Sequence, residues 1–246
     1  MEQKYSDWFK IDLHIHTDKS KETKEGDYKG TFSVDTLKTK LKENEVRIFS
    51  LTDHNIVNVE AYRAYYTNYD EKEDPLLLLG VELDIQGSTK TYHSLLIFNH
   101  SDIQSVESIS EKLEKKYSDK SISDKKQRVL SIKDIVDIFE KEDFFFIPHA
   151  GDASKNIVSG NRSSIPETQR MLILMQSALE KVTREEIIKH YNIGFDKLLS
   201  EEFQNKKDIA YITFSDNHCC EKYPKTHFGD NDFSHFYIKG IKSYES

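Results

Sequence analysis

The stretch Trp8-Phe9-Lys10-Ile11-Asp12-Leu13-His14-Ile15-His16-Thr17 decides the fold class. Its apolar residues predict a short buried β-strand over Phe9–Ile15. His14 and His16 stand two positions apart at the end of this strand, so both imidazoles face the same side and can reach one ion. The pair alone does not distinguish metal ligands from hydrogen-bonded histidines.

Beyond this strand, short apolar runs alternate with amphipathic, charge-rich segments. The expected further strands are Val46–Leu51, Leu76–Leu83, Tyr92–Phe98, Phe144–His149, Met171–Met175 and Ile209–Phe214, with another apolar run over Phe233–Ile238. The expected helices are Ser33–Asn44 with Ser33 as N-cap, Val57–Tyr69, Ser105–Tyr117, Ser131–Lys141, Glu180–Tyr191 and Asp196–Gln204. This alternation predicts an α/β fold whose parallel sheet is open or closed into a barrel. We expect one domain over residues 1–246.

Composition excludes several classes of protein. The chain has 35 Lys and Arg against 43 Asp and Glu, so its net charge of −8 argues against a nonspecific nucleic-acid-binding chain. Its two cysteines, Cys219 and Cys220, are adjacent and predict neither a disulfide framework nor a zinc motif. The longest apolar run, Pro75–Val81, is far too short to span a membrane. Without a signal-peptide pattern, we expect a cytoplasmic protein with no membrane partner.

Ionisable residues gather where the predicted strands end. In parallel α/β folds, chemistry collects at the carboxyl ends of the strands. Besides the first pair, the residues are Asp53 and His54, Glu82, His93, His149, and Asp216 with His218. His93 falls early in its strand and fits this rule less well. Burying so many ionisable groups without partners would be prohibitive, and bound metal ions remove that cost.

The donor types indicate which ions would bind. A set rich in histidine with a few carboxylates suits Zn²⁺, Mn²⁺ or Fe²⁺ better than Ca²⁺ or Mg²⁺ alone. The donors exceed one tetrahedral shell, so at least two ions are expected. Two ions about 3.5–4 Å apart can supply a metal-activated hydroxide and bind both oxygens of a phosphoryl displacement. The sequence therefore favours a metal-dependent phosphatase or phosphodiesterase.

Other charged segments have less certain roles. Lys155 and Arg162 lie in a loop after His149, where they could bind substrate phosphate or be solvated charges. Lys112–Arg128 is rich in basic residues and reads either as a solvated helix end or as a phosphate-binding patch. Lys19–Gly30 is a polar loop that could form a lid.

Six segments together resemble the PHP superfamily, the polymerase and histidinol phosphatase domain. They appear in the family's order and span residues 12 to 218. The segments are Asp12-Leu13-His14-Ile15-His16-Thr17, Leu51-Thr52-Asp53-His54-Asn55, Gly80-Val81-Glu82, Tyr92-His93-Ser94-Leu95-Leu96, Ile147-Pro148-His149-Ala150 and Ser215-Asp216-Asn217-His218. The resemblance implies a distorted (β/α)7, TIM-like barrel with two or three metal ions at the carboxyl face of its strands.

The resemblance also implies roles for these residues. One ion would be held by His14, His16, Glu82 and Asp216, and a second by Glu82, His93 and His149, with Glu82 bridging. His54 and His218 would sit at a third site, which relatives often complete with a His, Asp or Glu soon after the HxH pair. The nearest acidic residues here are Asp18 and Glu22, and neither aligns clearly.

A finer resemblance concerns PHP domains fused ahead of a large ATPase in bacterial phage-defence proteins. The opening Trp8–Thr17 and the ending Phe236–Gly240 are similar to theirs. The motif GxxxxGK[ST] is absent from the 246 residues, so the chain is either an excised domain or a stand-alone homologue. This resemblance implies antiviral defence, an ATPase domain or subunit as partner, and a nucleic-acid substrate acted on by a nuclease. A nucleotide or another phosphorylated small molecule stays open as substrate.

Two residues are candidates for catalysis beside the metal. His218, or His54, could protonate the leaving group if it is not a ligand, because histidine titrates near neutral pH. Asp53 is better placed to orient its neighbours than to bind metal.

Two alternative functions remain: an amidohydrolase, which also opens with HxH, and a non-catalytic PHP module of a larger ATPase. The sequence does not give the oligomeric state.

Overall fold

The computed structural model describes residues 7–86, 91–122, 124–148, 214–225, 236–240 and 242. The chain divides into two compact units. The first unit comprises Met1–Val81, Ile97–Gln127 and Ile212–Ser246, and the second comprises Glu82–Leu96 and Arg128–Tyr211. Each unit is described by itself below, within the described residues.

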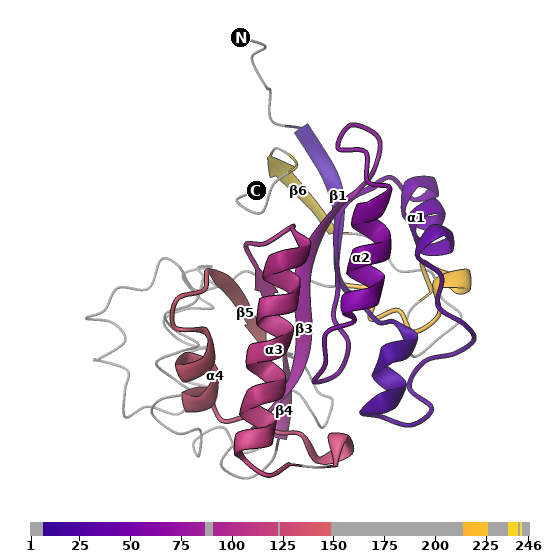
Figure 1. Ribbon diagram of the computed structural model, residues 1–246. Coiled ribbons are helices and arrows are strands. Elements are labelled where there is room, and N and C mark those ends of the chain that lie inside the picture. The colour runs from indigo at the N-terminus through magenta and orange to yellow at the C-terminus, as the bar shows by residue number, and fades with distance from the viewer. Residues whose placement is uncertain are drawn as a thin grey trace, which may run out of the picture. The chain divides into compact units, whose positions relative to one another are not determined.

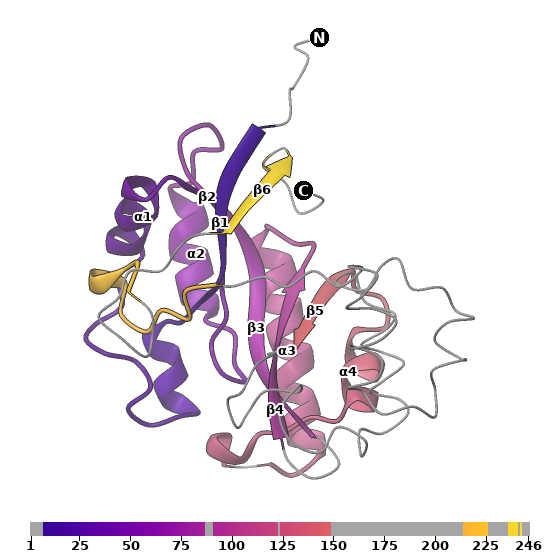
Figure 2. The ribbon, with the colours of Figure 1, turned by 180° about the vertical axis from the view of Figure 1, so that it is seen from behind.

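The first unit is built on parallel strands. Strand β1 (Asp7–Ile15) pairs in parallel with β2 (Val46–Leu51), which pairs in parallel with the start of β3 (Leu76–Gln86). On its other side, β1 pairs with β6 (Phe236–Gly240) in the antiparallel direction (Figure 2). Within the first unit the strand order is β3-β2-β1-β6.

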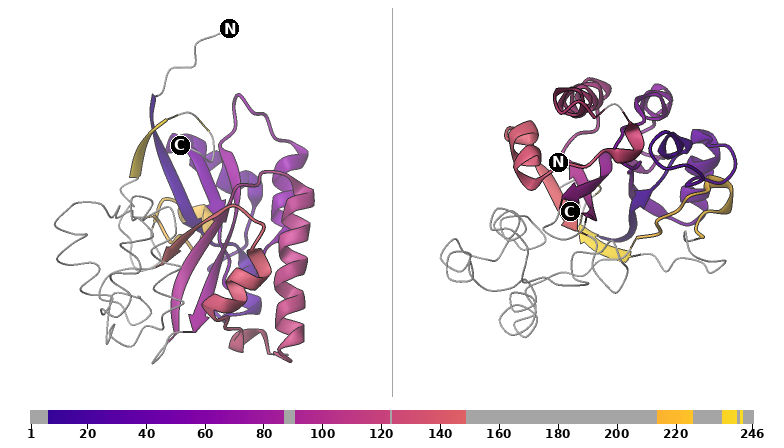
Figure 3. Two further views of the ribbon diagram at one scale, coloured as in Figure 1. Left: turned by 90° about the vertical axis from the view of Figure 1, so that its left-hand side faces the viewer. Right: turned by 90° about the horizontal axis from the view of Figure 1, so that it is seen from below.

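Three helices cover one face of these strands (Figures 1 and 3). They are α1 (Val34–Glu43), α2 (Val59–Thr67) and α3 (Ile103–Asp119). The predicted cap is confirmed, since the hydroxyl of Ser33 accepts a hydrogen bond from the backbone N–H of Thr36 at 3.2 Å. The hydrophobic positions that the sequence pattern gave to the core, such as Leu37 and Leu41 in α1, are buried.

Tyr62 of α2 joins two strands by hydrogen bonds. Its side chain is fully buried, and its hydroxyl donates to the carbonyl of Leu51 at 2.9 Å. The same hydroxyl accepts from the backbone N–H of Gly80 at 2.9 Å. The helix is thereby bonded to the end of β2, from which Asp53 and His54 emerge.

The second unit begins within β3, at Glu82. Strand β3 ends at Gln86, and β4 (Thr91–Phe98) begins after only four residues. So short a connection does not allow a crossover, so β3 and β4 run antiparallel. The expected regular β–α repeat is therefore wrong at this point. The reversal also explains His93: the start of β4 lies beside the end of β3, where Glu82 stands.

The remaining described elements are short. Helix α4 (Ile132–Phe139) begins with a capping box between Ser131 and Asp134 and is followed by β5 (Phe144–Pro148). The 3₁₀ turns are η1 (Asp18–Glu22), η2 (Lys125–Gln127) and η6 (Cys220–Lys222). Within the described part of the chain, no helix is long and apolar enough to cross a membrane.

Several predictions lie outside the described residues. These are the strand Met171–Met175, nearly all of Ile209–Phe214, and the helices Glu180–Tyr191 and Asp196–Gln204. The fold is thus mixed α/β, whereas the sevenfold barrel and the single domain stay predictions.

Candidate metal centre

The end of β1 gathers residues from both ends of the chain. Ile15 forms a parallel bridge with Asn217, and the backbone N–H of His16 donates to the carbonyl of Asn217 at 2.9 Å. The segment that carries Asp216 and His218 therefore lies alongside the HxH pair. Residues two hundred positions apart meet here, as the sequence predicts.

One carboxylate oxygen of Asp216 lies among three imidazoles. Its Oδ1 is 3.2 Å from Nε2 of His14 and 3.2 Å from Nε2 of His16. Nε2 of His218 lies 3.0 Å from the same oxygen. Burial alone would raise the pKa of Asp216, but the imidazoles outweigh it and hold the pKa well below its ordinary value.

A second carboxylate, Asp27, lies on the other side of the same rings. Its Oδ2 is 3.0 Å from Nδ1 of His218 and 3.4 Å from Nε2 of His54. The rings of His16 and His218 stack with centroids 3.9 Å apart. One ligand atom each from His16, Asp27, His54 and His218 can be chosen so that all four lie within 4.8 Å of one another. The set is buried and could hold a metal ion.

Sequence reasoning missed Asp27. The acidic neighbours considered for a third site, Asp18 and Glu22, do not take this place: Asp18 begins η1, and Glu22 pairs with Lys19 at 2.7 Å. The loop instead folds back over β2, with the Thr23 hydroxyl donating to the carbonyl of His54 at 2.6 Å. Asp27 reaches the histidines only because the loop folds back, and no local sequence pattern predicts this fold-back.

The ammonium of Lys24 stands beside the same carboxylate. Its Nζ is 2.8 Å from Oδ1 of Asp27 and 3.2 Å from Nε2 of His54. Half of the Lys24 side chain is exposed to solvent, whereas that of Asp27 is fully buried. A cation therefore reaches the cluster from its open side.

Asp53 holds the loop rather than an imidazole. Its Oδ1 accepts from the Thr17 backbone N–H at 2.8 Å and from the Ser20 hydroxyl at 2.7 Å, and its Oδ2 accepts from the Thr17 hydroxyl at 2.7 Å. The Ser20 hydroxyl lies 3.0 Å from Nδ1 of His16. Burial raises the pKa of Asp53 against these donors. Asp53 thus reaches His16 through Ser20.

Asp12 is a further buried carboxylate that sequence reasoning did not single out. Its Oδ1 accepts from the backbone N–H groups of Ser215 at 3.1 Å and His14 at 3.3 Å, and Oδ2 accepts from the Tyr223 hydroxyl at 2.9 Å. Burial raises the pKa of Asp12 to about 6, although these donors act in the opposite direction. The contact with Ser215 fixes the backbone directly before Asp216, which has a positive φ of 50°.

The second unit contains another imidazole–carboxylate group. Nδ1 of His93 lies 2.6 Å from Oε1 of Glu82, and its Nε2 lies 3.3 Å from Oδ1 of Asp84. Burial would lower the pKa of His93, but the charges of Glu82 and Asp84 raise it to about 9. Glu82 and His93, predicted to share an ion, are thus neighbours. Because the units are described separately, bridging by Glu82 stays a prediction.

Three predicted residues, His149, Lys155 and Arg162, lie outside the described residues. The residues present in the first unit nevertheless fit divalent metal ions. Four imidazoles and two carboxylates converge, and Nε2 of His14 and Nε2 of His16 face each other at 3.0 Å. Nitrogen and carboxylate donors in this proportion, with no thiolate in contact, suit Zn²⁺, Mn²⁺ or Fe²⁺.

Comparisons with known proteins found only distant similarities. No family model matches the chain, and no curated protein matches it. Among solved structures, a protein from Bifidobacterium adolescentis assigned as a metal-dependent phosphoesterase is similar over 87% of this chain and 89% of its own, at 15% identity and a TM-score of 0.48. An amidohydrolase from Chromobacterium violaceum, with bound sulfate and no metal, is similar over 85% and 88%, at 14% identity and a TM-score of 0.44. Likenesses this weak do not indicate which reaction the chain performs.

Metal binding should release protons. Burial would lower the pKa of His218, but Asp216 and Asp27 raise it to about 9, so the metal-free ring is protonated at neutral pH. A ligand must lose that proton, so we expect the affinity for Zn²⁺ or Mn²⁺ to rise with pH up to about 9, by about tenfold per unit for each proton displaced. Calorimetric titration at pH 7.5 in two buffers of different ionisation enthalpy counts the protons. Equal heats in both buffers would contradict this expectation.

Proposed function

We propose that this protein is a metal-dependent phosphoesterase that hydrolyses a phosphate mono- or diester. The observation that carries the proposal is the convergence of four histidines on the carboxylates of Asp27 and Asp216. Such a set of neutral nitrogen and anionic oxygen donors holds several divalent cations close together, and a cationic centre of this kind matches the charge of a phosphate ester.

The ligand assignment combines the family pattern with the contacts in each unit. His14, His16 and Asp216 would hold one ion together with Glu82. His93 and His149 would hold another, with Glu82 shared. In the third set, Asp27 joins His54 and His218, in the place that relatives often fill with a His, Asp or Glu soon after the HxH pair. Divalent ions bound by these residues would supply a nucleophile at neutral pH, by lowering the pKa of bound water, and would offset the charge of the phosphate.

Side chains of the protein then orient the ligands and protonate the leaving group. His218 faces carboxylates from both ring nitrogens, an arrangement that favours its protonated form. In our proposal, when the third ion is not bound and His218 is therefore not a ligand, its Nε2–H protonates the leaving oxygen. Asp53 acts as a positioning residue, because it holds Ser20, whose hydroxyl contacts His16. Without Asp53 the orientation of the His16 ring would be less well fixed.

Lys24 supplies a cation for the substrate in our proposal. Its ammonium lies beside Asp27 and His54 and is half exposed, so it can contact a phosphate oxygen without leaving the loop. A charge-assisted hydrogen bond of this kind strengthens substrate binding. Lys155 and Arg162 keep their proposed role as further phosphate contacts.

The finer parts of the proposal rest on the sequence resemblance. They are a nucleotide or nucleic-acid substrate and a role in phage defence beside an ATPase domain or subunit. Apart from the resemblance, we also propose a cytoplasmic location. The competing classes are an amidohydrolase and a non-catalytic module. An amidohydrolase usually has a metal-bridging lysine on a middle strand. In the described part of the site, carboxylates lie between the imidazoles, and no lysine at the end of a strand contacts them.

Hydrolysis of a phosphate ester panel tests the proposal. We expect the protein with Mn²⁺ or Zn²⁺ to cleave p-nitrophenyl phosphate or bis-p-nitrophenyl phosphate and to leave cyclic amides intact. Asp216→Asn keeps the side-chain shape but removes the charge that faces three imidazoles, so kcat/KM should fall by more than about 100-fold. The control Asp119→Ala, at the exposed end of α3, should retain full activity. Amide hydrolysis, or no turnover with any metal, would overturn the proposal.

Loss of the Lys24 cation should weaken substrate binding more than turnover. We expect Lys24→Ala to raise KM about tenfold, the effect of one charge-assisted hydrogen bond, and to change kcat much less. Lys29, exposed on the same loop, provides the matched control Lys29→Ala, for which KM should stay unchanged. Steady-state kinetics on the best ester measures both. Equal effects of the two substitutions would show that Lys24 does not contact substrate.

A further inference from the structure

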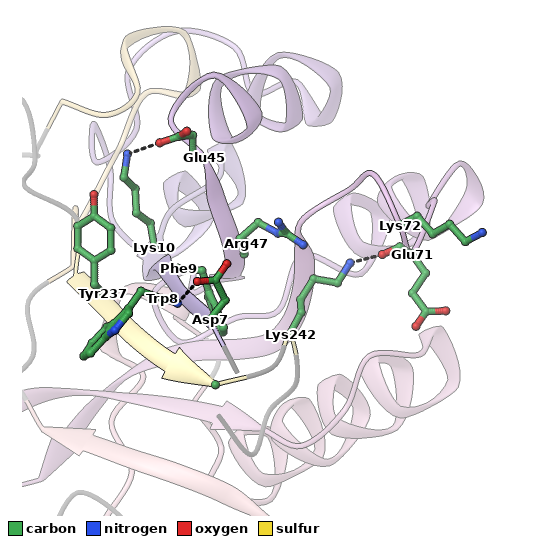
Figure 4. A pocket seen from close by; sticks show the side chains of 11 residues that line it. Asp7, Trp8, Phe9, Lys10, Glu45, Arg47, Glu71, Lys72, Tyr237 and Lys242 are labelled. Atoms are coloured by element: carbon green, nitrogen blue, oxygen red, sulfur yellow. Dashed lines mark hydrogen bonds and ion pairs between the residues drawn. The ribbon is translucent and has the colours of Figure 1, made fainter. Parts of the chain in front are cut away.

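A hollow of about 730 Å³ opens at the other end of β1, away from the histidine cluster. Trp8 and His14 are six residues apart on this strand, which corresponds to about 20 Å. All the residues that line the hollow belong to the first unit, and none belongs to the proposed metal centre. Figure 4 shows the aromatic rings on one side of the hollow and two cations on the other.

The aromatic side comes from the pairing of β1 with β6. Trp8 lies opposite Lys239 and Lys10 opposite Tyr237, so these four side chains share one face of the ribbon. Trp8 is 62% exposed and Tyr237 is 52% exposed, the two large hydrophobic side chains exposed to this degree in the described part of the chain. Aromatic rings thus alternate with lysines on an exposed face.

The cationic side is formed by Arg47 and Lys242. Among the described residues, Arg47 makes no ion pair and no side-chain hydrogen bond, and no carboxylate lies within ion-pair distance of Lys242. The ammonium of Lys242 instead donates to the backbone carbonyls of Glu71 and Asp74. Burial, followed by the charge of Arg47, lowers the pKa of Lys242. The charges of Glu71, Asp74 and Asp70 act on this pKa in the opposite direction, but within the described residues none of these carboxylates forms an ion pair with Lys242 or Arg47, and Asp74 pairs with Lys38 and Lys42. Two neighbouring cations without an ion-paired acid form a site for an anion.

The carboxylates that line the hollow do not cancel these two cations. Glu45 is largely exposed and pairs with Lys10 at 3.2 Å, and Asp7 accepts from the backbone N–H of Trp8 at 2.8 Å. The carboxylate of Glu71 points away from Lys242 in Figure 4. Within the described residues, Arg47 and Lys242 therefore stay without an ion-paired carboxylate and can face an anion, although the whole chain carries −8.

We propose that this hollow binds single-stranded nucleic acid, with bases stacked on Trp8 and Tyr237 and a phosphate held by Arg47 and Lys242. A flat apolar face beside an anion site matches a base and its phosphate. Two separate rings on two strands suit successive nucleotides better than one nucleotide. A duplex keeps its bases stacked inside and cannot use these rings. The inference does not rest on the proposed hydrolysis, because no metal ligand takes part.

The test uses the full chain in EDTA, which prevents metal-dependent cleavage during binding. Trp8 is the only tryptophan, so its fluorescence reports on this hollow alone. Titration with an octathymidylate at low salt should quench the fluorescence saturably and bind at least tenfold more tightly than thymidine monophosphate. The proposal would be overturned if the fluorescence showed no saturable change, or if the monophosphate bound as tightly as the oligonucleotide. It would also be overturned if the fluorescence changed only with the protein concentration and not with the oligonucleotide concentration.

Substitutions locate the binding surface. With a fluorescein-labelled octathymidylate, polarisation should show that Trp8→Ala and Arg47→Ala each weaken binding at least tenfold. Removing one phosphate contact should also reduce the slope of log affinity against log salt by about 0.7. Arg63→Ala, an exposed arginine on α2, is the matched control and should bind as the unmodified chain does. Equal losses in Arg47→Ala and Arg63→Ala would show nonspecific charge binding and contradict the proposal.

Discussion

The first unit depends on the contacts between the carboxylate of Asp216 and three imidazole nitrogens. It joins the end of β1 to a segment two hundred residues later in the chain, and the backbone there follows the strand as a parallel bridge. Burying an ionised carboxylate among unpaired neighbours would be prohibitive, so the charges must meet. Asp27 repeats the arrangement on the other side of His16 and His218.

Two further buried carboxylates serve the backbone around this cluster. Asp12 accepts N–H groups from His14 and Ser215, and Asp53 accepts from Thr17 and Ser20. Each carboxylate therefore fixes a loop that carries or supports a histidine. The buried carboxylates thus have two roles. Those that accept from backbone amides fix the positions of the loops, and those that contact imidazoles determine the charge that a cation would meet.

Local patterns predict much of this arrangement. The HxH spacing at the end of Phe9–Ile15 places both imidazoles on one side, and α1 begins at its predicted cap. Glu82 and His93 are neighbours, as their shared role requires. The errors concern chain direction and distant contacts: β4 turns back on β3 without a helix, and β6 runs antiparallel to β1. Apolar runs give the strands but not their direction.

Asp27 shows most clearly which contacts sequence patterns do not predict. Its position in a polar loop resembles that of any solvated acid, and only the folded loop, tied to His54 through Thr23, brings it under the rings. The hollow at Trp8 was equally hidden, since it forms only when β6 pairs with β1. Both features depend on contacts between segments that are distant in sequence, which periodicity does not encode.

The central claim is that the histidine cluster exists to hold metal ions. Elemental analysis of the purified protein, after dialysis against metal-free buffer, tests it most directly. The account predicts about two or more equivalents of zinc, manganese or iron per chain, and fewer in Asp27→Ala, since the cluster combines more donors than one ion needs. A folded protein with no bound metal, and none taken up when Zn²⁺, Mn²⁺ and Fe²⁺ are supplied, would contradict the account.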